Sequence, residues 1–301
     1  MTAKQRFISA KSTTKSTRKR PSRTEKLTGW TGSDQPKVMS ETEPGISIII
    51  TVKNEEKHIG KLLESLLGQD CIFEVVIVDS ESTDGTEGVI SLFRNRFPSI
   101  VYIKEKSTRG GGRNTGVRNA KFEYVAFTDG DAVAGDQWAC HMLEALLKYD
   151  VVAGKTVQEG SKVYSKLRRV ELLMDGKEIT APSANLGYRK SLFMELGGFD
   201  ESMVTAEDID LNLRAVLKGS TWKMDETCII YNHTRETFYA FIKQAFWNGY
   251  GRRQLAMKHG KILRKLTSPS IFTGDYMSLF YVIRFFPAFA GYIACMLFPG
   301  K

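Results

Sequence analysis

Asp129 and Asp131, separated by a single glycine, have the residue type and spacing of a metal site. They follow residues 124–128, an apolar run typical of a buried strand. In an extended segment the side chains of residues i and i+2 point the same way, so the two carboxylates converge. A hard divalent cation such as Mg²⁺ or Mn²⁺ would relieve their repulsion and keep positions open for phosphate oxygens. On the tripeptide alone, a turn with solvated aspartates is the stronger interpretation.

Asp79 and Arg113 are two further candidates for ligand binding. Asp79 follows the strand predicted at 73–78 and could accept a hydrogen bond from the edge of a base, or it could form a turn. Arg113 follows the glycines at 110–112, which suit a phosphate approaching the backbone. Its guanidinium could face a diphosphate, or it could be an exposed residue at a helix start.

Glu207 and Asp208 open a helix predicted at 206–218. A carboxylate at that position could act as a general base toward a hydroxyl group. The alternative is structural, because Thr205 and Asp208 have the spacing of a capping box. Asp210 and Arg214, four residues apart, are interpreted as an ordinary pair on the helix surface.

Strands that alternate with helices must position these residues. Strands are predicted at 46–52, 73–78, 100–103 and 124–128, and helices at 55–69, from the turn at 82–86 to about 97, and at 114–121. This alternation predicts βαβ units and a parallel, doubly wound sheet, with further strands at 151–154 and 227–231. The glycine-rich segment 109–113 is predicted as a loop. Ligands bind such sheets at the carboxyl ends of the strands, where Asp79 and Asp129 lie.

Charge divides the chain unevenly. Residues 1–27 hold nine basic residues and one acidic residue, and therefore eight of the nine net positive charges. Residues 1–44 are predicted to be a disordered basic tail. Nucleic-acid binding by this tail has no support from aromatic residues or a recognition motif. The four cysteines have no ligand spacing and are interpreted as small apolar residues in a reducing compartment.

Six segments in the same order resemble the family 2 glycosyltransferases of the GT-A fold. They cover about residues 45–250 and read SIIITVKNEE (47–56), VIVDSESTDGT (76–86), GRNTG (112–116), FTDGD (127–131), NLGYRKSLFMELGGFDE (185–201) and EDIDLNLR (207–214). The resemblance implies a GT-A domain at 45–250 with a mainly parallel sheet flanked by helices. It also implies transfer of a sugar, with inversion, from a nucleotide-sugar donor to an acceptor hydroxyl.

The resemblance also implies roles for individual residues. Asp208 would be the catalytic base of the ED motif, with Glu207 beside it on the acceptor side. Mg²⁺ or Mn²⁺ would bind to the DxD residues Asp129 and Asp131, and His233 is placed like a late metal-binding histidine of the family. Donor-binding positions carried over from the family are Thr51, Asn54, Glu55, Asp79, Arg113 and Asp129. A UDP-sugar is favoured over a GDP- or dTDP-sugar as donor.

Residues 251–301 are predicted to be a basic and then apolar helical segment that associates with a membrane. Residues 276–298 carry one charge, Arg284, and basic residues cluster just before them between 252 and 265. Such a segment would place the domain on the cytoplasmic face of the cell membrane, beside a glycan or lipid-linked acceptor. Two other functions are a catalytically inactive transferase-like scaffold protein and a sugar nucleotidyltransferase. A sugar nucleotidyltransferase would normally have a glycine-rich pyrophosphorylase loop near its first strand, and this sequence has no such loop there.

Overall fold

The computed structural model describes residues 43–97, 99–159, 171–233, 237–265 and 277–298, and Thr42–Lys301 form one compact unit. The basic tail predicted at 1–44 therefore lies almost wholly outside the described residues. The expected boundary between residues 250 and 251 falls inside helix α7 (Phe238–His259).

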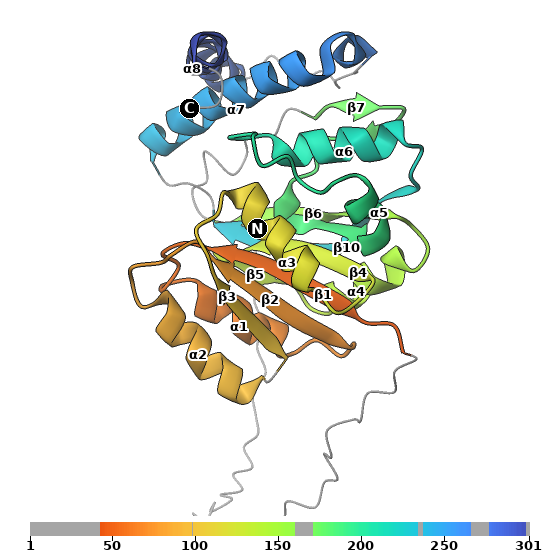
Figure 1. Ribbon diagram of the computed structural model, residues 1–301. Coiled ribbons are helices and arrows are strands. Elements are labelled where there is room, and N and C mark those ends of the chain that lie inside the picture. Colours follow the sequence, from red (N-terminus) through yellow and green to blue (C-terminus); the bar gives the residue numbers. More distant parts are fainter. Residues whose placement is uncertain (1–42, 98, 160–170, 234–236, 266–276, 299–301) are drawn as a thin grey trace, which may run out of the picture. The chain divides into compact units, whose positions relative to one another are not determined.

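A mixed eight-stranded sheet with the order β3-β2-β1-β4-β9-β6-β10-β5 forms the centre of this unit (Figure 1). β1 to β4 pair in parallel, as do β6 and β10, whereas β9 runs antiparallel to β4 and β6, and β5 antiparallel to β10. The strands are β1 (Ile46–Val52), β2 (Phe73–Asp79), β3 (Ile100–Lys104), β4 (Tyr124–Asp129), β5 (Ala132–Ala134), β6 (Val151–Glu159), β9 (Leu186–Arg189) and β10 (Trp222–His233). A separate pair joins β7 (Leu173–Met174) to β8 (Lys177–Glu178). The mainly parallel sheet agrees with the sequence prediction.

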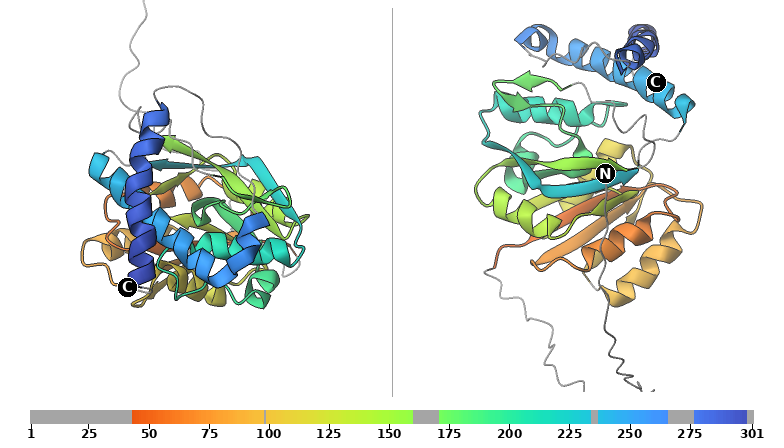
Figure 2. Two further views of the ribbon diagram at one scale, coloured as in Figure 1. Left: turned by 90° about the horizontal axis from the view of Figure 1, so that it is seen from above. Right: turned by 180° about the vertical axis from the view of Figure 1, so that it is seen from behind.

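Helices cover both faces of the sheet, and alternate residues of each strand supply the two cores (Figure 2). Ile48 and Ile50 of β1 pack with α1 (Ile59–Leu66), α2 (Thr86–Arg96) and α4 (Trp138–Leu146). Ile49 points to the opposite core, with α3 (Arg109–Asn119), α5 (Lys190–Glu195) and α6 (Glu207–Leu217). Because both faces are buried, the central strands are apolar throughout, which is why they could be predicted from the sequence.

The prediction of a glycine-rich loop at 109–113 is wrong, because α3 begins at Arg109. Thr108 caps this helix by accepting a hydrogen bond from the backbone N–H of Gly111 at 3.0 Å. A Cβ at Gly112 would lie 3.0 Å from Ser107 Oγ and 3.1 Å from Thr51 Cγ2. The close packing of the first turn against β1 therefore requires glycine, although glycine is intrinsically a poor helix former.

The C-terminal part consists of α7, the 3₁₀ segment Gly260–Lys265 and α8 (Met277–Leu297). A Cβ at Gly249 of α7 would lie 1.7 Å from the carbonyl oxygen of Ala288, and one at Gly291 of α8 would lie 1.9 Å from that of Phe246. The backbones of the two helices are therefore in direct contact. Within the described part of the chain, none of the helices has the length and apolar character to cross a membrane.

Candidate active site

Arg113 occupies the centre of the site. It is fixed in α3, its side chain is 1% exposed, and its two terminal nitrogens bind carboxylates on different elements. Nη2 donates to Asp129 Oδ1 at the end of β4 at 2.7 Å, and Nη1 donates to Glu207 Oε1 at the start of α6 at 3.1 Å. The guanidinium also lies 5.6 Å from the centre of the Phe199 ring. One side chain therefore joins α3, β4 and α6.

Asp208 lies beside this bridge, partly accessible to solvent but surrounded by protein. Its carboxylate accepts hydrogen bonds from the backbone N–H groups of Ser183 at 3.3 Å and Ile209 at 2.8 Å. Burial first, and then the negative charge of Glu207, raise the pKa of Asp208 to about 6, although Arg113 and the two hydrogen bonds lower it. A carboxylate with a pKa near neutrality is suited to accept a proton.

The turn before α6 does not form the capping box that the sequence allowed. The helix is capped by Ala206, with φ 64° and ψ 22°, and no side chain makes a cap hydrogen bond. A residue with a Cβ is unfavourable in this left-handed conformation, which persists only where the surrounding structure holds it. Asp208 therefore does not form a capping box with Thr205.

Asp131 and Asp129 lie close to Glu55, on the loop after β1. Burial raises the pKa of Glu55, and the charges of Asp131 and Asp129 raise it further, against a hydrogen bond with His58 at 3.0 Å that lowers it. Among the side chains that the structure describes, no three histidine, cysteine or acidic residues form a group that could hold a metal ion.

His233 ends β10, and its side chain lies outside what the structure describes. The antiparallel pairing of Asn232 with Ala132 nevertheless brings the backbones of His233 and Asp131 to neighbouring positions. The register is compatible with the predicted metal-binding role of His233, which stays a prediction.

The predicted donor-binding residues lie along the carboxyl ends of β1 and β2. Asp79 is fully buried, and its two carboxylate oxygens accept hydrogen bonds from Ser82 N–H and from Tyr102 Oη, each at 2.7 Å. Asn54, with φ 58°, accepts at Oδ1 from the N–H of Thr83 at 2.8 Å. Asn54 ties the loop after β1 to the loop after β2, whereas Asp79 holds the loop after β2 and Tyr102 of β3. Contact of Asp79 with a base stays a prediction.

Three other predicted residues have clear positions. Thr51 pairs with Asp129 in the register of β1 and β4. Glu55 is held through its backbone N–H, which donates to Thr86 Oγ1 at 2.8 Å. Glu207 is 5% exposed and paired with Arg113. Its predicted position on the acceptor side stays a prediction.

The predicted pairing of Asp210 with Arg214 is confirmed, but its predicted position on the helix surface is wrong. Asp210 is completely buried and binds Arg214 at 2.7 Å, Lys258 at 2.9 Å and His259 at 2.7 Å. Lys258 and His259 come from the end of α7. The spacing of four residues on one helix predicts the pair of Asp210 with Arg214. The contacts of Asp210 with Lys258 and His259 arise from the packing of α7 and do not follow from that spacing.

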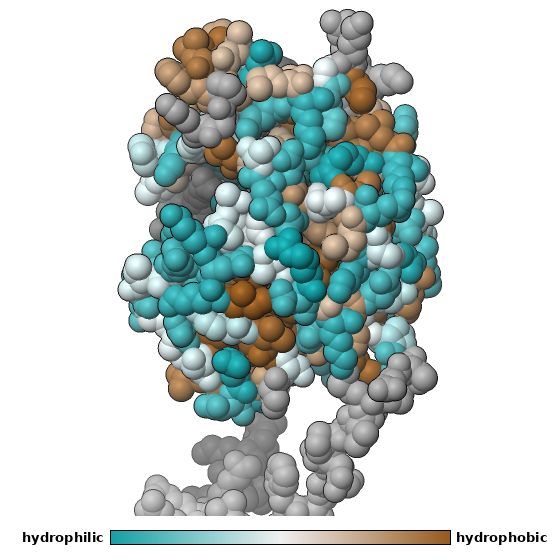
Figure 3. Space-filling model, viewed as in Figure 1, coloured by the Kyte–Doolittle hydropathy of each residue, from teal (hydrophilic) through white to brown (hydrophobic). Residues whose placement is uncertain are grey.

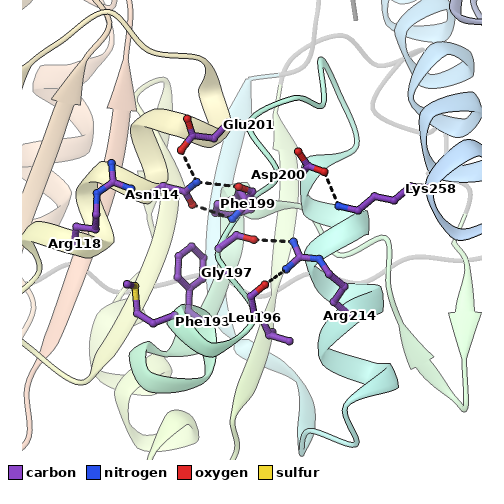
Figure 4. Close-up of a pocket in the computed structure, with 12 residues that line it drawn as sticks. Asn114, Arg118, Phe193, Leu196, Gly197, Phe199, Asp200, Glu201, Arg214 and Lys258 are labelled. Carbon is purple, nitrogen blue, oxygen red and sulfur yellow. Dashed lines mark hydrogen bonds and ion pairs between the residues drawn. The ribbon is translucent and has the colours of Figure 1, made fainter. Parts of the chain in front are cut away.

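A cavity of about 490 Å³ adjoins this region (Figure 4). It is lined by α3, the loop after α5, α6 and Lys258 of α7. Asn114 holds the loop, since its Oδ1 accepts from Phe199 N–H at 2.9 Å and its Nδ2 donates to Phe199 O at 2.9 Å. Asn114 and Ser183 were missed as site residues; Asn114 stands beside Arg113 in the GRNTG segment, whereas nothing in the sequence marks Ser183.

The family model described as "Glycosyl transferase family 2" matches residues 47–197, and a second, described as "Glycosyl transferase family group 2", matches residues 168–300. The chain belongs to glycosyl transferase family 2. It is therefore a glycosyltransferase, and the first match includes Arg113, Asp129 and Asp131. Asp208 lies outside the first match and inside the second.

Named relatives agree with this assignment. The glycosyltransferase AglE of Haloferax volcanii is 25% identical over 244 residues, which are 76% of this chain and 79% of that protein. The pre-mycofactocin glycosyltransferase of Mycobacterium tuberculosis is 24% identical over 233 residues, 71% of this chain but 48% of that protein. The chain thus spans about half the length of the mycobacterial relative.

Two solved structures confirm the predicted GT-A fold. The mannosyltransferase PcManGT from Pyrobaculum calidifontis, in complex with GDP-Man and Mn²⁺, matches with a TM-score of 0.59 at 19% identity. The match covers 87% of this chain and 77% of the PcManGT chain. TarS of Staphylococcus aureus, in complex with UDP, matches with a TM-score of 0.53 at 22% identity, and the match covers 69% of this chain and 65% of the TarS chain. At these identities the likeness concerns the fold alone.

Replacing Arg113 by lysine tests the bridge. A lysine keeps the positive charge but cannot donate in two directions from a rigid fork, so one buried carboxylate loses its partner. Breaking a buried ion pair costs about 3–5 kcal/mol, so we expect Arg113→Lys to lower Tm by about 5 °C or more in thermal unfolding. Arg118→Lys, on the exposed end of the same helix, is the matched control. Equal Tm values for the two variants would contradict the bridge.

Proposed function

We propose that this glycosyltransferase moves a sugar from a nucleoside-diphosphate donor to an acceptor hydroxyl with inversion, using Asp208 as the base and a divalent cation. The observation that carries the proposal is the position of Asp208, a carboxyl of raised pKa beside the Arg113 bridge. Asp208 would take the proton of the hydroxyl as its oxygen attacks the anomeric carbon. The bond from that carbon to the diphosphate breaks, and its electron pair leaves with the diphosphate.

The residues near Asp131 fit a cation of the Mg²⁺ or Mn²⁺ class. They offer carboxylate oxygens, which such ions prefer, and burial first and then the negative charges of Asp131 and Asp129 raise the pKa of Glu55. When bound, the cation would neutralise charge on the leaving diphosphate. Asp131 is the ligand that we favour of the two, and Asp129 also forms an ion pair with Arg113.

UDP-sugars are the donors we favour, followed by GDP- and dTDP-sugars. The solved TarS structures contain UDP or UDP-GlcNAc, and that of PcManGT contains GDP-Man. For the acceptor we propose a glycan or a lipid-linked molecule. The scaffold and nucleotidyltransferase alternatives are not favoured, since the family match and the Asp208 environment both point to sugar transfer.

We also propose that α8 lies on the cytoplasmic face of the cell membrane. Its side away from α7 is an exposed apolar stripe, and the hydropathy surface is brown over this helix (Figure 3). The stripe consists of Phe285, Phe286, Phe289, Ile293, Met296 and Leu297, all between 37% and 68% exposed. Burial first and then the charge of Arg284 lower the pKa of Arg252, and Arg284, on α8 itself, could face anionic headgroups. Lys258, expected to do so too, is instead bound to Asp200 and Asp210.

Asp208→Asn is expected to lower kcat by at least about 10²-fold with a UDP-sugar donor, because the variant cannot accept the proton. Its folding should not suffer. The pKa of Asp208 is higher in the folded chain than in the unfolded chain, so the ionised carboxylate costs stability above about pH 6, and this cost disappears as the pH falls through the ordinary carboxyl range. We therefore expect the Asp208→Asn variant to have a higher Tm than the wild type at pH 8, and a smaller advantage at pH 5. Undiminished kcat would refute the base assignment.

Asp131→Asn is expected to abolish metal-dependent transfer without lowering Tm. The measurement is nucleotide release from a panel of UDP-, GDP- and dTDP-sugars over a titration with Mn²⁺ or Mg²⁺. Asp136→Asn, an exposed carboxylate five residues further on, is the control and should behave as the wild type. Normal turnover of Asp131→Asn at every metal concentration would refute the metal assignment.

Membrane binding is tested by sedimentation with vesicles that contain phosphatidylglycerol. We expect the full chain to sediment with them at low salt, and the double variant Phe286→Glu/Phe289→Glu to stay in the supernatant. Leu92→Glu, on an exposed position of α2 that is 69% accessible, should sediment like the wild type. A wild-type chain that stays in the supernatant would show that the stripe does not bind this surface.

A further inference from the structure

One face of α7 is built against the turn that leads into α6. Gly251, Gln254 and Lys258 follow one another at helical spacing and all contact the segment 200–210. A Cβ at Gly251 would lie 2.8 Å from Ala206 Cβ and 2.8 Å from Thr205 Cγ2. The helix backbone therefore rests directly on the left-handed turn.

Hydrogen bonds and ion pairs extend this contact in both directions. Gln254 Oε1 accepts from the backbone N–H of Val204 at 3.1 Å, just before the turn. Lys258 Nζ binds Asp200 at 2.5 Å and Asp210 at 2.9 Å, so it spans the segment from its first residues to the first turn of α6. On the other side, Glu207 is held by Arg113. The residue that follows Glu207 is Asp208.

We propose that Gly251 and Gln254 are positioning residues that fix the orientation of Asp208 by holding the turn at Thr205 and Ala206. Neither residue touches the reacting atoms. Ala206 bears a Cβ in a conformation that favours glycine, so it needs an external constraint, and the Gly251 surface of α7 supplies it. This inference rests on the proposed role of Asp208 as base.

The test is Gly251→Ala in the full chain, assayed for transfer over a range of donor concentrations. A misplacement of about 1 Å can cost on the order of 10²-fold in rate, so we expect a loss of that size in kcat with little change in the donor KM. Gly88→Ala is the matched control, because a Cβ at this exposed position of α2 meets no atom within 4 Å. The triple variant Gly251→Ala/Ala206→Gly/Thr205→Ser removes both clashing carbons and should recover much of the lost kcat.

Gln254 gives a second test that adds no atoms to the contact. Gln254→Glu keeps an accepting oxygen for the N–H of Val204 and should retain kcat, whereas Gln254→Met has similar length without that oxygen and should lower it. If folded Gly251→Ala matches Gly88→Ala in kcat, or if Gln254→Met and Gln254→Glu have equal kcat, the positioning role is wrong. That outcome would leave the proposed role of Asp208 as base standing, since this role falls if Asp208→Asn keeps an undiminished kcat.

Discussion

The guanidinium of Arg113 lies inside the protein, and the site is arranged around the carboxylates that compensate its charge. Removing a cation from water costs several kcal/mol, which good geometry with counter-charges can offset. Here Asp129 and Glu207 supply two hydrogen-bonded contacts from separate elements. Because β4 carries Asp129 and α6 carries Glu207, the position of Asp208 next to Glu207 depends on the same bridge. Arg113 Nε is buried without a hydrogen-bond partner among the described residues, so the two carboxylates do not satisfy all the donors of the guanidinium.

The same charges explain why two adjacent acidic residues can have different roles. Glu207 faces Arg113 directly at 3.1 Å. Asp208 accepts hydrogen bonds from the backbone N–H groups of Ser183 and Ile209, and burial first and then the charge of Glu207 raise its pKa. When two neighbouring carboxyl groups lie in different environments, one can neutralise a cation while the other exchanges a proton. A cation that binds Asp129, as we propose, would share this carboxylate with Arg113.

Much of the fold could be predicted because the central strands are buried on both faces and the helices repeat at 3.6 residues. The first four strands were placed within one residue at either end. The predictions that were wrong concern residues whose structure depends on contacts with residues distant in sequence. The glycines at 110–112 were predicted as a loop, but they form the first turn of α3, where Gly110 packs against Phe199 and Gly112 against Thr51. Thr205 and Asp208 had capping spacing, but the chain turns at Ala206 instead. Asp210 has the spacing of an exposed pair, and only Lys258 and His259 show that it is buried.

Helix α7 shows why the C-terminal segment should be considered together with the catalytic core. Gly249 and Gly251 are two residues apart, so they lie on nearly opposite sides of the helix. Gly249 lets the backbone of α8 approach at Ala288, and Gly251 lets α7 rest on the turn before Asp208. A glycine within a helix costs about 1 kcal/mol relative to alanine, and two in one turn are tolerable where both sides need close approach. A single helix backbone therefore joins the contact with α8 to the contact with the turn before Asp208.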